Sequence, residues 1–429
     1  MRIILKSTRR ARGGPNYRQS GHTAAEPVAA RAPLRPSHRL LTSLSDQRTH
    51  LRMNRTQTFI PRLESMRGIA ALLVAASHVV QAPTGPTTEL LTHPGIEFGT
   101  GSRLLYATIV HAVDGLQAVI FFFVLSGFVL TRSLLREASP SPAQAAEFVI
   151  ARLFRLYPAI IFAIGSFATA LALFGAAPAA LTILKNMALI STSLNGVMWS
   201  LQLELLAIPV IYVMYLLLLR GTRLALMAAI AISLGLVVMS FDPSIHKVLG
   251  DPPLQLFYAF TFGCFCAASS GRLASRLSPM QANIAVAICI ILFFTARPML
   301  GPASTWRFLV NSLSAWGMIY LVAYGPRASL LNVLDQPIAH WLGKLSFSYY
   351  LFHFLTITPV WNHPEFLVWL IDTVGMPRPA VALLIFSAST MAALTLAYIC
   401  YSFVELPGIR LGRAVRGLLP LRIRGVPAS

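Results

Sequence analysis

The amino-acid sequence predicts an all-α, polytopic membrane protein with about ten transmembrane helices and both termini in the cytoplasm. Three observations predict this class. The chain of 429 residues is 55% hydrophobic and only 12% charged, whereas a soluble domain carries about 25% charged residues. Long apolar stretches follow one another along the chain, and arginines gather in alternate gaps between them. Such a chain belongs in a bilayer.

A transmembrane helix needs about 20 mostly apolar residues, and ten stretches of the chain approximately meet this criterion. A further apolar segment at 180–190 is short, and an eleventh full span there would invert every later loop. We therefore expect it to form a re-entrant or interfacial helix. The ten predicted spans are 67–84, 107–131, 150–174, 199–219, 223–240, 254–270, 280–296, 308–325, 341–361 and 380–404.

The arginine-rich gaps predict the orientation of the spans, because loops that face the cytoplasm carry an excess of Lys and Arg. The loops that alternate with them are poorer in both residue types. The formal net charge of +20 therefore reflects orientation signals, and we expect no nucleic-acid partner. The predicted cytoplasmic gaps contain Arg132, Arg136, Arg152 and Arg155; Arg220 and Arg223; Arg272 and Arg276; Arg327 and Lys344; and the run 410–424.

The two ends of the chain differ from its apolar middle. Residues 1–58 contain Arg, Pro and Ser without hydrophobic periodicity, which predicts a disordered basic tail, and Met53 is a candidate alternative start. Residues 59–408 form the expected membrane domain, and 409–429 a basic cytoplasmic tail. The cysteines lie in apolar stretches without metal-binding spacing. We expect them to be small buried side chains and expect no metal site: Cys264, Cys266, Cys289 and Cys400.

Ionisable residues inside the predicted spans are the first functional candidates, because each costs about 2.5–3.5 kcal/mol at the bilayer centre on insertion scales. Those within spans are His78, His111, Asp114, Glu204 and His353, and those at cytoplasmic span ends are Arg67, Lys344 and Glu405.

The spacing of Arg67 and His78 places both on one side of one helix. They are eleven residues apart, which is close to three turns and about 16 Å along the axis. One helix therefore offers a cation at the cytoplasmic surface and an imidazole near the midplane. His353 lies nine residues beyond Lys344, at a comparable depth, and Glu204 approaches the same level from the outer side.

These residue types suit acyl transfer. A neutral imidazole can remove the proton of a substrate hydroxyl as it attacks a thioester, and can return it to the leaving thiolate. A nearby carboxylate would orient the ring and stabilise the imidazolium. Arginines at the cytoplasmic edge can hold the phosphates of coenzyme A by charge-assisted hydrogen bonds.

Structural roles remain open for the same residues. A single intramembrane histidine can simply hydrogen-bond a neighbouring helix, and Asp114 and Glu204 can tie helices together. His111 lies close to the predicted outer surface, where we expect no role for it. Arg132 and Arg136 read as orientation signals.

With these residues in place, the sequence resembles the acyltransferase-3 family of integral membrane acyltransferases from about Pro61 to Pro407. LESMRGIAALLVAASH carries the basic residue, ten intervening residues and the histidine, and Glu64 stands where the family usually has Asp. The other matching segments are FFFVLSGFVL at 121–130, RLFRLYP with Arg152 and Arg155, MWSLQLELL with Glu204, LGKLSFSYYLFH ending in His353, and VELP with Glu405.

The resemblance implies a protein of the inner membrane that transfers an acyl group, expected to be acetyl, from acetyl-CoA or another acyl-CoA. The acceptor would be a carbohydrate, such as that of lipopolysaccharide, capsule or a glycolipid. It also implies that His78 is the catalytic histidine, with Glu204 and His353 as further catalytic candidates. Arg67, Arg152 and Arg155 would serve the donor. Glu64, Asp114, Lys344 and Glu405 would support the site. A separate extracytoplasmic protein would supply any role of the hydrolase-like domain that many relatives carry.

A transporter or flippase is the main alternative, because intramembrane charges also form substrate and proton paths. The sequence shows no evident repeat in two halves, which disfavours it. Acyltransferases that use a His-x4-Asp motif are disfavoured because neither His78 nor His353 is followed by Asp at that spacing.

Overall fold

The computed structural model describes residues 59–80, 113–136, 140–242, 254–302 and 304–418. The predictions for the N-terminal tail 1–58, for Met53 and for His111 lie outside these ranges, as does the end of the basic tail at 419–429. In the described ranges all regular secondary structure is helical, and no strand is present. The fold is therefore all-α, as predicted.

The helices follow the predicted spans closely. A helix occupies each of the ten predicted ranges, and a short helix, α7, covers the segment predicted to be re-entrant or interfacial. The principal helices are α2 (Pro61–Val80), α5 (Gly115–Leu134), α6 (Pro142–Leu173), α7 (Ala180–Met187), α8 (Trp199–Leu206), α9 (Ile208–Arg220), α10 (Arg223–Met239), α12 (Phe257–Ala268), α14 (Pro279–Leu300), α15 (Thr305–Tyr324), α16 (Pro337–Asn362), α17 (Pro364–Val368), α18 (Arg378–Cys400) and α19 (Leu406–Leu418).

Within the described ranges, six helical segments are long and apolar enough to cross a membrane. A seventh joins α15 to the short helix η3 (Ser329–Asp335) through a bend of 80°. Helices α10 and α12 are apolar but shorter than 18 residues. The multi-pass membrane class is thus confirmed, while the count of ten spans and the orientation of the termini stay predictions.

The predicted boundary at residue 408 falls inside a continuous helical stretch. Helix α18 passes through a π-helical turn, η5 (Tyr401–Glu405), directly into α19, and together they extend from Arg378 to Leu418. The first part of the predicted basic tail is therefore helical. Glycines at 408 and 412 let α19 lie against Phe154 and Pro158 of α6.

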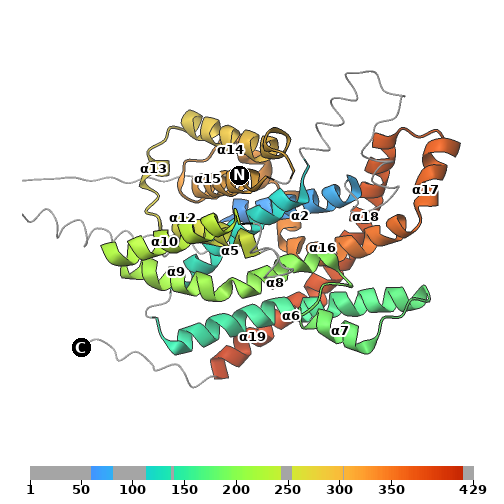
Figure 1. Ribbon diagram of the computed structural model, residues 1–429, viewed down its shortest axis with the longest axis horizontal. Coiled ribbons are helices and arrows are strands. Elements are labelled where there is room, and N and C mark those ends of the chain that lie inside the picture. Colours follow the sequence, from blue (N-terminus) through green and yellow to red (C-terminus); the bar gives the residue numbers. More distant parts are fainter. Residues whose placement is uncertain (1–58, 81–112, 137–139, 243–253, 303, 419–429) are drawn as a thin grey trace, which may run out of the picture. The chain divides into compact units, whose positions relative to one another are not determined.

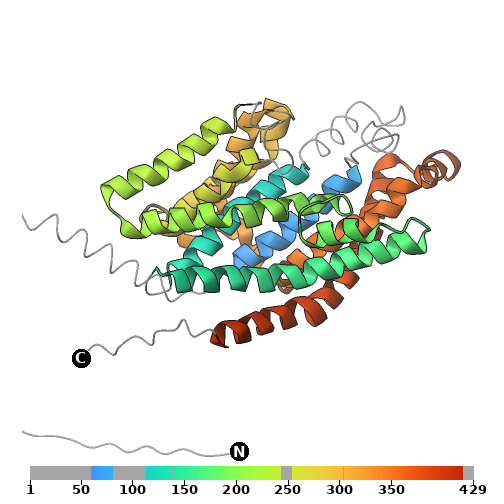
Figure 2. The ribbon, with the colours of Figure 1, turned by 60° about the horizontal axis from the view of Figure 1, so that its bottom comes forward.

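Two glycine-lined crossings position the helices around the centre of the membrane domain. A Cβ on Gly68 of α2 would come within 2.7 Å of the Gly343 backbone of α16, and a Cβ on Gly127 of α5 would come within 2.0 Å of the Phe260 carbonyl of α12. Small residues at such crossings let helix backbones approach closely. In Figure 1, α2 and α5 accordingly lie between the α14–α15 pair and the α6–α19 pair, and Figure 2 shows α19 running along α6.

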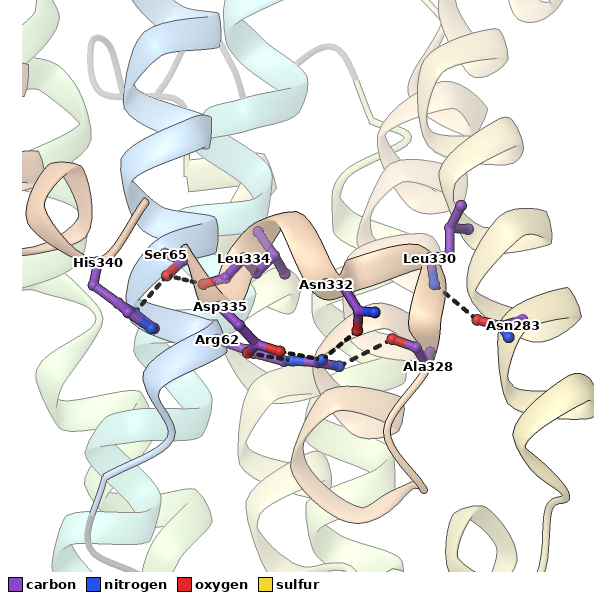
Figure 3. Close-up of polar contacts among 9 residues, drawn as sticks. All are labelled: Arg62, Ser65, Asn283, Ala328, Leu330, Asn332, Leu334, Asp335 and His340. Carbon is purple, nitrogen blue, oxygen red and sulfur yellow. Dashed lines mark hydrogen bonds and ion pairs between the residues drawn. The ribbon is translucent and has the colours of Figure 1, made fainter. Parts of the chain in front are cut away.

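The start of α2 is fastened to η3 by Arg62 (Figure 3). Its guanidinium donates to Asp335 at 2.8 and 2.5 Å, to the Asn332 side chain at 3.1 Å and to the Ala328 carbonyl at 3.1 Å. One turn later, the Ser65 hydroxyl donates to the Leu334 carbonyl at 2.7 Å and lies 2.9 Å from the His340 ring. We call this set of contacts the Arg62 clamp.

Candidate active site

A cavity of about 100 Å³ lies where α2, α5, α6, α8 and α16 meet. Apolar side chains make most of its wall, and polar side chains enter from all five helices. We call it the central cavity. Its polar and aromatic lining includes Arg67, Ser126, Arg152, Arg155, Ser200, Glu204, Ser346 and Tyr350.

Four residues predicted from separate motifs therefore line one cavity. Arg67 comes from α2, Arg152 and Arg155 come from α6, and Glu204 comes from α8. Arg152 and Arg155 are three residues apart, so both face the cavity from one side of α6. The three arginines thus meet although 85 residues separate Arg67 from Arg152 in the sequence.

Glu204 is held by an ion pair and a hydrogen bond. Its carboxylate accepts from the Arg152 guanidinium and from the Ser126 hydroxyl, the latter at 2.7 Å. The Arg152 and Glu204 side chains are only 12% and 16% exposed, so neither charge is well solvated. Glu204 was predicted to lie near the histidines; its hydrogen-bond partners are instead Arg152 and Ser126.

The supporting acidic residues lie at different places around the arginines. Glu64 is half-buried beside Arg67 and lines a second cavity next to the first. Glu405 is buried in η5, where it accepts from the Ser348 hydroxyl at 2.8 Å and interacts electrostatically with Arg155 and Arg67. Lys344 is exposed and belongs to the lining of neither cavity.

The two histidines lie together at the other end of α2. His78 is in the last turn of α2, and its ring centroid is 5.4 Å from that of His353 on α16. Phe354 and Trp361 also contact the His78 ring, at 5.8 and 6.1 Å between centroids. We call these four residues the histidine layer. The comparable depths predicted for His78 and His353 agree with this contact.

A hydrogen bond fixes the tautomer of His353. Its Nδ1 lies 2.7 Å from the Tyr350 carbonyl oxygen, and a carbonyl only accepts, so Nδ1 carries the proton in the neutral ring. Nε2 then carries the lone pair. In the described part of the chain this atom is buried without a hydrogen-bond partner. The imidazole is thus oriented by a backbone carbonyl, not by the carboxylate expected from the sequence.

Tyr350 connects the histidine layer to the central cavity. Its ring lines the cavity and lies 5.5 Å from the His353 ring between centroids. Its hydroxyl donates to the Val197 carbonyl at 2.9 Å and lies 2.8 Å from the Ser200 hydroxyl. The cavity therefore ends one side chain away from His353.

Asp114 lies at the start of a helix and not within one. It is the N-cap of α5, where its side chain accepts from the Leu116 N–H at 3.1 Å. It also pairs with Arg307 of α15 at 2.5 Å, and both residues are buried. This arrangement fits the structural reading, an interhelix tie at one helix end.

Sequence reasoning did not single out Ser126, Ser200 or Tyr350. Ser126 and Ser200 lie inside the quoted segments FFFVLSGFVL and MWSLQLELL, and Tyr350 lies in LGKLSFSYYLFH. A hydroxyl costs little in an apolar helix, since it can donate to the carbonyl of the preceding turn. Composition alone therefore gave no signal for them.

The comparisons with known proteins agree with this geometry. The family match defines the class of this helical membrane domain, a membrane acyltransferase. A family model for the acyltransferase-3 domain matches residues 60–402, and the chain belongs to this acyltransferase family. The comparison with curated proteins gave no match, and neither did the comparison with solved structures.

Proposed function

We propose that this protein transfers an acyl group, acetyl in the first instance, from acyl-CoA to a hydroxyl of a carbohydrate such as a surface polysaccharide or glycolipid. The observation that carries the proposal is the placement of two kinds of group along α2. Arginines line a cavity at one end of the helix, and two histidines in ring contact lie about 16 Å further along it.

The donor would bind with its phosphates toward Arg67 and Arg155. Guanidinium groups suit phosphates because they donate two parallel hydrogen bonds in a fixed plane. Arg152 is already paired with Glu204, so its role is to complete the wall and keep the carboxylate away from the donor. The long pantetheine arm of coenzyme A can then bring the thioester toward Tyr350.

The acceptor hydroxyl would lose its proton to His78 as its oxygen attacks the thioester carbonyl. The tetrahedral intermediate then collapses, the C–S bond breaks, and the imidazolium returns the proton to the thiolate of coenzyme A. The products are the ester and free coenzyme A. The Nε2 lone pair of His353 can accept the other N–H of the His78 imidazolium, the role of the carboxylate in a Ser-His-Asp triad.

The proposed setting is the inner membrane, with acyl-CoA entering from the cytoplasm. An acceptor that arrives from the outer side would meet the histidine layer first, because the histidines lie at the end of α2 opposite the Arg62 clamp. A separate extracytoplasmic protein would present such an acceptor.

The test uses membranes that contain the full-length protein and acetyl-CoA labelled in the acetyl group. We expect label in the carbohydrate fraction and an equal amount of free thiol from coenzyme A with the wild type, and loss of both with His78→Ala. His363→Ala is the matched control, since His363 is exposed and pairs with the exposed Glu365 outside both cavities. Equal label transfer by the wild type and His78→Ala would reject the catalytic role of His78. Uptake of a solute without label transfer would favour a transporter function.

A further inference from the structure

A second cavity of about 220 Å³ adjoins the central cavity. We call it the vestibule. The two cavities share four lining residues, so they adjoin at Arg67 and Arg155. The shared residues are Arg67, Leu125, Val129 and Arg155.

The vestibule is strongly basic. Arg67, Arg132, Arg136 and Arg155 line it, and Glu64 is its one acidic lining residue among those described. Arg132 lies in the last turn of α5 and Arg136 two residues beyond its end, and both side chains line the vestibule. The Arg132 guanidinium lies 5.6 Å from the centroid of the Phe128 ring, which also lines the vestibule. This contact restrains the guanidinium on the cavity wall.

The arginines act on one another electrostatically. Burial and, second, the neighbouring charge of Arg132 lower the pKa of Arg136, which follows the last residue of α5 by two positions. The guanidinium nevertheless keeps its charge, because arginine is effectively always protonated in proteins. A polyanion in the vestibule would relieve this repulsion at several guanidiniums together.

Orientation in the membrane explains only part of the arrangement. Arginines after a span keep a loop in the cytoplasm, and cations near a helix C-terminus stabilise the helix. Both effects require charge near the end of α5. Neither requires that Arg132 and Arg136 share a cavity wall with Arg67 and Arg155 from two other helices.

We propose that the vestibule binds the phosphorylated nucleotide end of the acyl-CoA donor, with Arg132 and Arg136 as phosphate ligands. This inference rests on the proposed function and assigns the substrate's recognition to residues that the donor motifs do not contain. Arg67 and Arg155 would then stand at the junction, where the pantetheine arm leaves the phosphates and enters the central cavity. The site would discriminate between thioesters by the presence of a phosphorylated nucleotide, which lies far from the reacting carbonyl carbon.

The test compares two acetyl donors, acetyl-CoA and acetyl-pantetheine, which lacks the nucleotide and all three phosphate groups. Charge-assisted hydrogen bonds to phosphate are about twice as strong as neutral ones, and the Gln side chains make only neutral ones. We therefore expect the double variant Arg132→Gln/Arg136→Gln to raise KM for acetyl-CoA at least about tenfold. Its kcat and its KM for acetyl-pantetheine should stay near those of the wild type. The variant Arg132→Lys/Arg136→Lys should recover part of the affinity for acetyl-CoA, because each lysine still places a positive point charge near the phosphates.

The control is Arg220→Gln/Arg223→Gln, which removes the same charge from an exposed turn between α9 and α10. It should leave both KM values unchanged. Absence of transfer by the wild type with either donor would reject the proposed function. Transfer by the wild type together with an unchanged KM for acetyl-CoA in the Arg132/Arg136 variant would reject the vestibule site alone.

A lipid phosphate is the competing source of the same chemistry, and thermal unfolding separates the two. Free coenzyme A should raise the unfolding temperature of the wild type more than that of the Arg132→Gln/Arg136→Gln variant, in nanodiscs of phosphatidylcholine. If coenzyme A stabilises both equally, and phosphatidylglycerol nanodiscs stabilise only the wild type, the vestibule binds lipid headgroups and the inference is wrong.

Discussion

The two ends of α2 differ in how their polar groups are satisfied. Around Arg67, charged side chains meet carboxylates and hydroxyls from several helices, as in the Arg152–Glu204–Ser126 set. In the histidine layer, aromatic rings surround His78, and His353 Nε2 is buried without a hydrogen-bond partner among the described residues. An unpartnered polar atom is costly in an apolar interior. The arginine end is built to hold charge, whereas the histidine end keeps a lone pair available.

The first prediction concerns removal of the His353 imidazole from the histidine end of α2. His353→Ala should lower kcat for acetyl transfer about 10²- to 10⁴-fold, the usual contribution of a positioned acid or base. KM for acetyl-CoA should change little, because the phosphate ligands are unaltered. Steady-state kinetics in proteoliposomes measure both values. His353→Gln, which keeps a hydrogen bond to the Tyr350 carbonyl, should also be inactive; activity of this variant would show that His353 only joins helices.

The second prediction concerns loss of the Arg152–Glu204 ion pair at the arginine end of α2. Glu204→Gln removes the carboxylate that neutralises Arg152 in a poorly solvated place, and unpairing a buried charge costs about 3–5 kcal/mol. We expect a markedly lower unfolding temperature in detergent. Glu204→Gln with Arg152→Met should regain part of the lost stability, because the uncompensated charge is then gone. A double variant less stable than Glu204→Gln would contradict the pairing.

The third prediction alters the packing of α16 against α2, on which the contact between His353 and His78 depends. Gly343→Ala places a methyl group within 2.3 Å of the Glu64 carbonyl across the α2–α16 crossing, and overpacking of this kind costs about 1–3 kcal/mol. The shift of α16 should displace His353 from His78, so kcat should fall with stability. Gly165→Ala is the control, since a Cβ there meets nothing within 4 Å. An equal effect of both variants would show that the crossing is not tight.

The fourth and smallest expected effect is on the Arg62 clamp. Arg62→Lys replaces a planar fork by a point charge and loses the contacts to Asn332 and Ala328 while keeping a charge near Asp335. The Asp335 side chain is 45% exposed, and an ion pair at the protein surface contributes about 0–1 kcal/mol. We expect a small decrease in unfolding temperature and unchanged kcat. A large loss of activity would show that the clamp shapes the donor cavities.

The sequence predicted the class of fold, because apolar length and arginine placement are local signals. It also predicted that Arg67 and His78 share one side of a helix, since that depends on helical periodicity alone. It could not predict the ring contact of His78 with His353, which depends on how α2 and α16 cross at Gly68 and Gly343. Packing between distant segments leaves no periodic signal in either.

Two predicted placements differ because helix ends are harder to predict than helix interiors. Asp114 caps α5 and pairs with Arg307, although hydropathy placed it inside a span. Glu405 lies in a π-helical turn within a continuous helix, where the sequence motif suggested only the end of a span. In both cases the local backbone, not the side-chain type, decides the surroundings of the carboxylate.

The Arg62 clamp also has a consequence for biogenesis. Arg62 and Asp335 are 273 residues apart, so the first helix of the membrane domain enters the bilayer long before its partner has been translated. At about 5–20 residues per second this interval lasts roughly 15 to 55 s. During that time α2 carries its cationic start without η3, and the clamp closes only when most of the chain has been inserted. Its formation therefore marks late assembly of the whole domain.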